Sequence, residues 1–322
     1  TTLGALLDGL KAGVPADTYA GALAAVSSMG PAQIERIVAH LRQMGAVVEA
    51  PEQADQTEPP VYRRQVEFFD LFETQGVTGL QLNERLRNRR VVVVGVGGFG
   101  TWIALYLSRI GVKHIIAVDP DRIEESNLSR QVLYRRSDVG RLKVDVVGER
   151  VKDSDPDIRF DGHPMLIQQP EDLSPLIQGA DLVFNPFGYL PSRTREAVAV
   201  ACMSANVPFL LCGSNIVGPL CVPGETACYR CLMDHDPTMT AAMQTLQANR
   251  WLPPQAPFAP MLAVTSAYAV WEAGRFLSGC DRPHTLNGLY TLDPLNYAVT
   301  FQQVERQPGC RLCDPTPTQK PR

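Results

Sequence analysis

Residues 91–131 read VVVVGVGGFGTWIALYLSRIGVKHIIAVDPDRIEESNLSRQ, and this stretch decides the fold. Four consecutive valines predict a buried β-strand, and a glycine-rich turn after them lets backbone N–H groups approach a phosphate. The glycines of this turn are Gly95, Gly97, Gly98 and Gly100. A helix should follow, and its positive N-terminal end favours an anion. A second strand, residues 114–118, ends at Asp119, where a carboxylate can bind the hydroxyls of a ribose. The stretch therefore predicts a nucleotide site.

The segment after Asp119 narrows the class of nucleotide. Residues 127–131 read NLSRQ, and a dinucleotide oxidoreductase needs neither an Asn nor an Arg at this place. An arginine offers a planar fork of donors to charged oxygens, which suits phosphates. We therefore expect a triphosphate here rather than a dinucleotide. The purely structural alternatives are a turn cap for Asp119 and a surface ion pair for Arg130.

The composition limits the class of protein and its partners. The chain has 322 residues, of which 45% are hydrophobic and 20% charged, and its formal net charge is −4. These values predict a globular protein with one large domain and a small one. A chain without a basic field, a long apolar run or a secretory signal is expected to bind neither nucleic acid nor a membrane. We expect it in the cytoplasm, with which its cysteine usage agrees.

The order of the expected elements predicts the domain organisation. Residues 1–52 show helical periodicity followed by a short strand, AVVEA, which is typical of a small winged-helix-like domain. A polar, proline-rich linker over residues 53–60 should separate it from a main domain over residues 61–322. The main domain alternates strands and helices, which predicts an α/β fold with a Rossmann-like, mostly parallel sheet. Its last two strands, within residues 289–305, should form an antiparallel C-terminal portion.

Two CxxC pairs predict a metal site. The pairs are Cys228 with Cys231 and Cys310 with Cys313. Four thiolates suit a tetrahedral Zn²⁺ site with no open position, so the zinc should be structural rather than catalytic. The alternative is two separate redox pairs.

Several strings in the main domain occur in the order typical of one family. GVGGFG, VDPDRIEESNLSRQ and DVGRLKV together resemble the ThiF/MoeB/ubiquitin-activating-enzyme superfamily of carboxylate adenylyltransferases. Upstream, YRRQ at residues 62–65 is similar to an N-terminal motif of this superfamily, and the CxxC pairs resemble its split zinc site. The resemblance covers residues 61–315.

Within the superfamily, the chain most resembles the peptide-modifying members. GPLCVPGETACYRC and the segment Phe258-Ala259-Pro260 resemble the microcin C peptide adenylyltransferase type, and the architecture is similar to the pantocin A glutamate-processing type. This resemblance implies that the N-terminal domain binds the leader of a ribosomally synthesised precursor peptide, which adds a strand to the winged helix.

The resemblance also implies the roles of individual residues. Asp119 should bind the ribose, and Asn127, Arg130 and Gln131 should contact the nucleotide and its phosphates. Lys143 should neutralise the phosphates of ATP, although a solvated helix lysine is the structural alternative. Arg64 is similar to an arginine that one subunit of a homodimer supplies to the other, so each active site would need two chains. Arg63 competes with Arg64 for this role.

The chain departs from the family pattern at two places. The family's Mg²⁺-binding Asp falls at Gly188, and the nearby Asn185 is a poor replacement for a carboxylate on a hard cation. The Mg²⁺ ligand is thus open, and loss of adenylation is one interpretation. The loop over residues 232–260, a predicted lid, lacks the cysteine that thioester-forming relatives carry. His235 in this loop is either a general base or a surface residue.

These features lead to one hypothesis and two alternatives. The sequence favours ATP-dependent adenylation of a carboxylate on a precursor peptide, which leads to dehydration, cyclisation or an amide-type modification in antibiotic biosynthesis, without a protein thioester. The first alternative is a non-catalytic scaffold that binds a leader peptide for a partner enzyme. The second is an activator of a ubiquitin-like sulfur-carrier protein.

Overall fold

The chain forms two compact units, Thr1–Leu80 and Gln81–Arg322. The computed structural model describes residues 2–15, 18–44, 47, 60–74, 76–187, 192–233, 258–293, 296 and 298–314. The first unit extends beyond the predicted linker, of which residues 53–59 lie outside the described residues. The predicted domain boundaries therefore stay predictions.

The first unit begins with a small helical domain. Its helices are α1 (Thr2–Ala12), α2 (Tyr19–Ser27) and α3 (Pro31–Gln43). Their apolar faces share a core in which Leu6, Leu23, Ile34 and Val38 are buried. The strand expected after α3 lies, apart from Val47, outside the described residues, so the winged-helix-like class stays a prediction. The unit continues with η1 (Pro60–Tyr62), α4 (Arg63–Phe69) and η2 (Asp70–Phe72).

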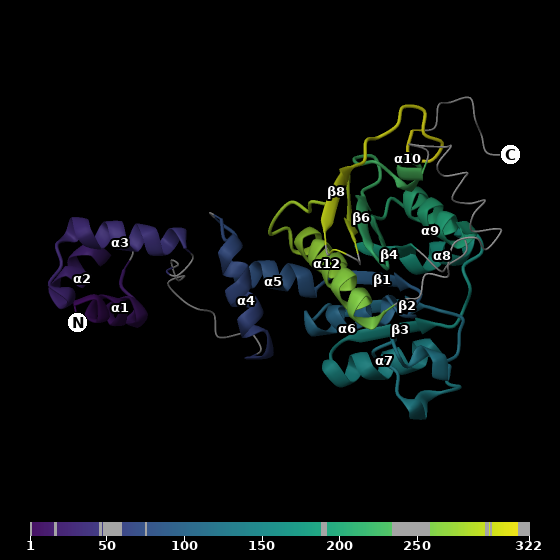
Figure 1. Ribbon diagram of the computed structural model, residues 1–322, viewed down its shortest axis with the longest axis horizontal. Coiled ribbons are helices and arrows are strands. Elements are labelled where there is room, and N and C mark those ends of the chain that lie inside the picture. Colours follow the sequence, from purple (N-terminus) through teal and green to yellow (C-terminus); the bar gives the residue numbers. More distant parts are fainter. Residues whose placement is uncertain are drawn as a thin grey trace. The chain divides into compact units, whose positions relative to one another are not determined.

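The second unit is built on an eight-stranded sheet, most of whose strands are labelled in Figure 1. The strands are β1 (Arg90–Val94), β2 (His114–Val118), β3 (Arg159–His163), β4 (Leu182–Phe187), β5 (Phe209–Gly213), β6 (Ile216–Cys221), β7 (Gly288–Leu292) and β8 (Val299–Gln303). Their order is β3-β2-β1-β4-β5-β6-β7-β8. The first five pair in parallel, and β5 to β8 pair antiparallel. The predicted α/β class, with its antiparallel C-terminal portion, is confirmed.

Helices cover both faces of this sheet (Figure 1). They are α5 (Gly79–Arg87, which begins in the first unit), α6 (Gly100–Arg109), α7 (Lys143–Ser154), α8 (Pro170–Ile177), α9 (Ser192–Ser204), α10 (Tyr229–Met233) and α12 (Ala259–Ser278), with short turns η3 (Glu125–Asn127) and η4 (Arg136–Asp138). Helices α6, α7 and α12 pack on one face, and α8 and α9 on the other. None of the helices in the described part of the chain is long and apolar enough to cross a membrane.

The valines of β1 lie at the centre of the core. Val91, Val92, Val93 and Val94 are all at most 3% exposed. Strand β1 pairs with β2 on one side and β4 on the other, so the strand order reverses there. Ligands of open parallel sheets bind at such a reversal, outside the carboxyl ends of the strands. The glycine-rich turn begins at this place, directly after Val94.

Candidate functional site

The glycine-rich turn is held in a shape that side chains would disturb. Gly95 has a φ of +83° and donates its N–H to the carbonyl oxygen of Val118, at 2.7 Å. A Cβ on Gly100 would lie only 1.9 Å from the carbonyl oxygen of Gly95. These two glycines therefore fix the backbone that leads from β1 into α6. A Cβ on Gly97, in contrast, would meet nothing closer than the amide nitrogen of Gln131, at 3.9 Å.

Asp119 connects the end of β2 to this turn. Its side chain is buried, and its Oδ2 accepts the N–H of Val96 at 2.8 Å while its Oδ1 accepts the N–H of Asp121 at 2.9 Å. Burial raises the pKa of Asp119, and the Lys143 ammonium and the two backbone N–H groups lower it in part. The carboxylate thus fixes the phosphate-binding turn relative to the position expected for a ribose.

Lys143 is the first residue of α7, and its side chain lies beside Asp119 and Asp121. Its Nζ lies 2.7 Å from Oδ2 of Asp121 and 3.9 Å from Oδ1 of Asp119. The lysine side chain is buried, which is uncommon for an ammonium unless it is paired. The interpretation of Lys143 as a solvated helix residue is therefore wrong.

The predicted phosphate contacts lie along the segment that follows Asp119. Gln131 is 3% exposed, and its Oε1 has no hydrogen-bond partner among the described residues. A buried polar atom without a partner points to a missing ligand or water. The aliphatic part of Arg130 lies beside Gly98, and its Nη1 donates to the carbonyl oxygen of Ser126 at 2.7 Å. The two side chains therefore flank the glycine-rich turn.

Asn127 is buried but has a local role in this structure. Its Oδ1 accepts the N–H of Glu124 at 3.1 Å, which closes a capping box on η3. The cap holds the short turn that presents Arg130 and Gln131. A direct contact between Asn127 and a nucleotide stays a prediction.

Sequence reasoning missed two buried residues that position the site. Tyr134 donates its hydroxyl to the carbonyl oxygen of Val96 at 2.6 Å, and burial raises its pKa far above the usual range. The carboxylate of Asp138 accepts the N–H of Arg135 at 2.9 Å and an N–H of Arg150 at 2.9 Å. Although burial raises the pKa of Asp138, these donors lower it below its usual value. Tyr134 belongs to no motif of the sequence, and Asp138, although it begins the string DVGRLKV, was assigned no role there.

The remaining candidate residues lie in the first unit, in the core of the sheet or outside the described residues. Arg64 lies on α4 in the first unit, is exposed, and forms an ion pair with Glu67 at 2.6 Å. Arg63 pairs with the same carboxylate at 3.3 Å. Gly188, His235 and most of the predicted lid lie outside the described residues. Asn185 is buried in β4, where its Nδ2 donates to the carbonyl oxygen of Arg195 at 3.2 Å.

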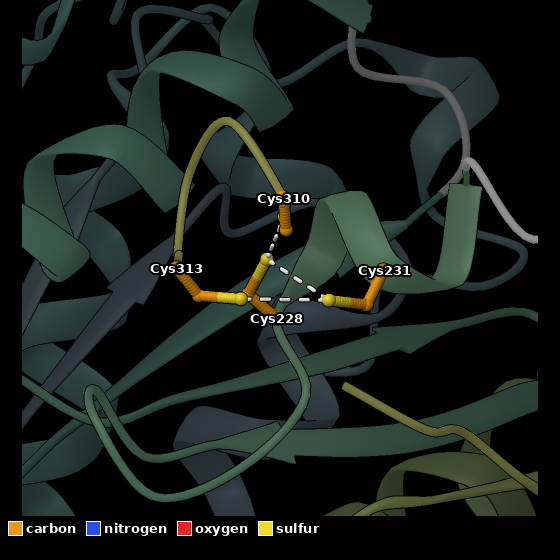
Figure 2. A group of neighbouring side chains, drawn as sticks. All are labelled: Cys228, Cys231, Cys310 and Cys313. Atoms are coloured by element: carbon orange, nitrogen blue, oxygen red, sulfur yellow. Dashed lines mark hydrogen bonds between the residues drawn. The ribbon is translucent and has the colours of Figure 1, made fainter. Parts of the chain in front are cut away.

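The two CxxC pairs meet in one cluster at the antiparallel end of the sheet (Figure 2). The Sγ atoms of Cys228 and Cys310 are 3.5 Å apart, and those of Cys231 and Cys313 are 3.4 Å apart. All four sulfur atoms lie within 4.8 Å of one another, and all four residues are buried. Ligands at a Zn–S distance of about 2.3 Å in a tetrahedron are separated by about 3.8 Å, so this geometry fits zinc.

Hydrogen bonds between side chains and the backbone hold the two halves of the cluster in place. The N–H of Ala227 donates to Oδ1 of Asn287 at 2.6 Å, beside the first pair. Arg306 donates to the carbonyl oxygens of Gly224 and Cys313, and so links the two loops. The interpretation of the cysteines as two separate redox pairs is therefore disfavoured, since the closest contacts join one pair to the other.

The sequence over residues 62–312 matches the model of the ThiF family. The chain belongs to the ThiF family. It is 32% identical to the sulfur carrier protein adenylyltransferase of Thermus thermophilus, over 75% of this chain and 88% of that protein. It is 27% identical to the sulfur carrier protein ThiS adenylyltransferase of Escherichia coli, over 78% of this chain and 94% of that protein. The predicted superfamily is confirmed.

A solved structure extends the likeness beyond the ThiF region. E. coli MccB with AMPCPP and MccA superposes with a TM-score of 0.77 at 24% identity, over 91% of this chain and 85% of that one. A second similar structure is that of the microcin C7 biosynthetic enzyme MccB in complex with N-formylated MccA. A superposition that covers 91% of this chain includes more residues than the main domain, residues 61–322, contains. The likeness therefore takes in part of the helical N-terminal region as well as the ThiF fold.

Proposed function

We propose that this ThiF-family chain is an ATP-dependent adenylyltransferase that activates a carboxylate of a ribosomally synthesised peptide. The observation that carries the proposal is the buried group of Asp119, Lys143 and Gln131 around the glycine-rich turn. Burying an ammonium and leaving an amide oxygen without a partner both cost free energy in a folded protein, whereas a nucleotide would use both groups.

Each part of this group has a function towards ATP. The N–H groups of the turn and the N-terminal end of α6 bind phosphate oxygens. Asp119 binds the ribose hydroxyls through the lone pairs that its two backbone donors leave free. Gln131 accepts from the nucleotide through Oε1, and Arg130 exchanges its bond to Ser126 for phosphate oxygens.

The chemical step forms a mixed anhydride. An oxygen of the peptide carboxylate attacks the α-phosphorus, the bond from that phosphorus to the β-bridging oxygen breaks, and pyrophosphate leaves. Lys143, Arg130 and Arg64 of the partner subunit in a homodimer stabilise the negative charge that grows on the phosphate oxygens. The resulting acyl-adenylate carries AMP as its leaving group.

The second step needs no thiol of the protein. The sequence has no cysteine between residues 234 and 260, and Cys202, Cys212 and Cys221 are buried. A nucleophile of the peptide itself can attack the acyl carbon and release AMP, which gives dehydration, cyclisation or an amide-type product. The likeness to MccB, which reaches into the N-terminal region, supports a peptide as the substrate and the N-terminal helices as the site for its leader.

Activation of a sulfur-carrier protein is the second candidate. The curated relatives with this activity are up to 32% identical over three quarters of the chain, and this favours it. Both candidates share the adenylation step and differ in the partner that brings the carboxylate. The first unit, which carries three helices before the ThiF match begins, favours the peptide.

We further propose that Cys228, Cys231, Cys310 and Cys313 hold a structural Zn²⁺. Bound there, zinc would cross-link the loop after β6 to the segment after β8, and four protein ligands leave it no position for substrate. For Mg²⁺ the loop after β4, where the family's carboxylate ligand would fall, lies outside the described residues. No step above depends on that ligand.

Pyrophosphate release separates these functions. The enzyme is incubated with ATP and either short peptides from reading frames adjacent to its gene or a small carrier protein that ends in Gly-Gly. Release with a peptide alone supports the proposal, and release with the carrier alone supports the second candidate. If the protein does not bind ATP, both fail and the leader-binding scaffold is favoured.

A further inference from the structure

Asp121 lies in the site next to Lys143, but no role has been assigned to it so far. Its Oδ2 accepts from Nζ of Lys143 at 2.7 Å, and this is the shortest contact that the lysine makes among the described side chains. The lysine side chain is 7% exposed, whereas that of Asp121 is 62% exposed. A buried ammonium is therefore neutralised by a carboxylate that itself faces solvent.

The backbone places these two residues opposite each other. Arg122 and Leu142 form an antiparallel bridge, and the N–H of Lys143 donates to the carbonyl oxygen of Asp121 at 3.0 Å. The N–H of Ile123 donates to the carbonyl oxygen of Arg141 at 2.9 Å on the same short ladder. The pairing of the two side chains is thus built into the main chain.

Asp119 does not form the same close ion pair with Lys143 as Asp121 does. Both of its carboxylate oxygens accept backbone N–H groups, and its nearer oxygen is 3.9 Å from Nζ. Asp121 accepts at hydrogen-bond distance, and its exposure gives the carboxylate water as a replacement partner once the ammonium leaves. Because the carboxylate is solvated, Asp121 can lose this partner at low cost, whereas the buried ammonium needs another negative group, which a phosphate supplies.

We propose that Asp121 is a positioning residue that holds Lys143 in the nucleotide-free enzyme and releases it to the phosphates of ATP. The inference rests on the proposed function. It assigns to Asp121 two opposing effects. The carboxylate competes with phosphate for the ammonium, which weakens ATP binding, and it keeps the ammonium directed into the site, which speeds the chemical step.

The variant Asp121→Asn separates these effects. It keeps the size of the side chain but removes the negative charge that competes with phosphate. We expect ATP to bind about fivefold more tightly, which corresponds to about 1 kcal/mol. We expect kcat to fall by about tenfold, less than the roughly hundredfold cost of displacing a reacting group by about 1 Å. A merely structural residue would weaken binding and turnover together.

The experiment is calorimetric titration of the full chain with ATP alone, followed by steady-state kinetics with the activating substrate. Asp145→Asn is the matched control, because this substitution removes the same negative charge. Asp145 is exposed in the first turn of α7, two residues after Lys143. Residues two apart on a helix do not face each other. Lys143→Gln serves as a second background, in which Asp121→Asn should have no effect on ATP binding.

The outcomes are distinct. Tighter binding with slower turnover in Asp121→Asn alone supports the inference. Unchanged or weaker ATP binding by Asp121→Asn overturns it and leaves the proposed function standing, as does an equal gain in Asp145→Asn, which would make the effect one of net charge. A wild-type chain that does not bind ATP overturns the inference together with the proposed function.

Discussion

Two glycines of the phosphate-binding turn, Gly97 and Gly100, should respond differently to the same added methyl group. In Gly100→Ala the new Cβ would lie 1.9 Å from the carbonyl oxygen of Gly95, more than 1 Å inside any normal contact. Overpacking of this kind costs about 2 kcal/mol, and the backbone must move to relieve it. In Gly97→Ala the nearest atom is 3.9 Å away, so the folded chain should accept it.

Thermal unfolding and ATP titration of the two variants test this reasoning. A cost of about 2 kcal/mol lowers the Tm of a domain of this size by about 4–8 °C, which we expect for Gly100→Ala only. Gly97→Ala should keep the wild-type Tm but bind ATP at least about tenfold more weakly, because its Cβ projects into space that we assign to phosphate. Equal Tm values for both variants would refute the steric argument, and wild-type ATP affinity in Gly97→Ala would refute the assigned position of the phosphates.

Three further results are expected. Cys310→Ser should lose bound zinc, measured by metal analysis, and unfold at lower temperature, whereas Cys280→Ser, outside the cluster, should keep the metal. Tyr134→Phe should cost about 1 kcal/mol in denaturant unfolding and weaken ATP binding, because the carbonyl oxygen of Val96 loses its donor; unchanged stability would contradict this. Burial, Glu73 and Glu67 raise the pKa of Asp70 from 3.8 to about 6. The folded chain therefore holds a proton that the unfolded chain has lost, and this contribution to stability disappears as the pH rises from about 4 to 6. Asp70→Asn should unfold at a higher temperature than wild type above pH 6, with the difference shrinking towards pH 4; a pH-independent difference would contradict the assignment.

The parts of the fold that could be predicted are those whose signal lies within one short segment. The valines of β1 and the glycines after them specify a buried strand and a tight turn by themselves. The four cysteines could be paired because their residue type and spacing suggest one chemistry. The structure confirms both, the first as an interior strand of the sheet and the second as a buried cluster.

The parts that could not be predicted depend on contacts between distant segments. Asp121 and Lys143 are 22 positions apart, and only the short antiparallel ladder at Arg122 shows that they meet. Tyr134 reaches back 38 positions to Val96, and a tyrosine in a polar loop gives no sign of this.

Isotope exchange between pyrophosphate and ATP tests the central claim most directly, because it reports reversible formation of an acyl-adenylate and does not depend on the later steps. The purified chain is incubated with ATP, labelled pyrophosphate and a substrate peptide, either with its free carboxylate or with the same group as an amide. The account predicts that label enters ATP only with the free carboxylate, and that Asp119→Ala and Lys143→Gln abolish the exchange. Exchange that is equal with the amide, or that survives in both variants, would contradict the assignment of this site to carboxylate adenylation.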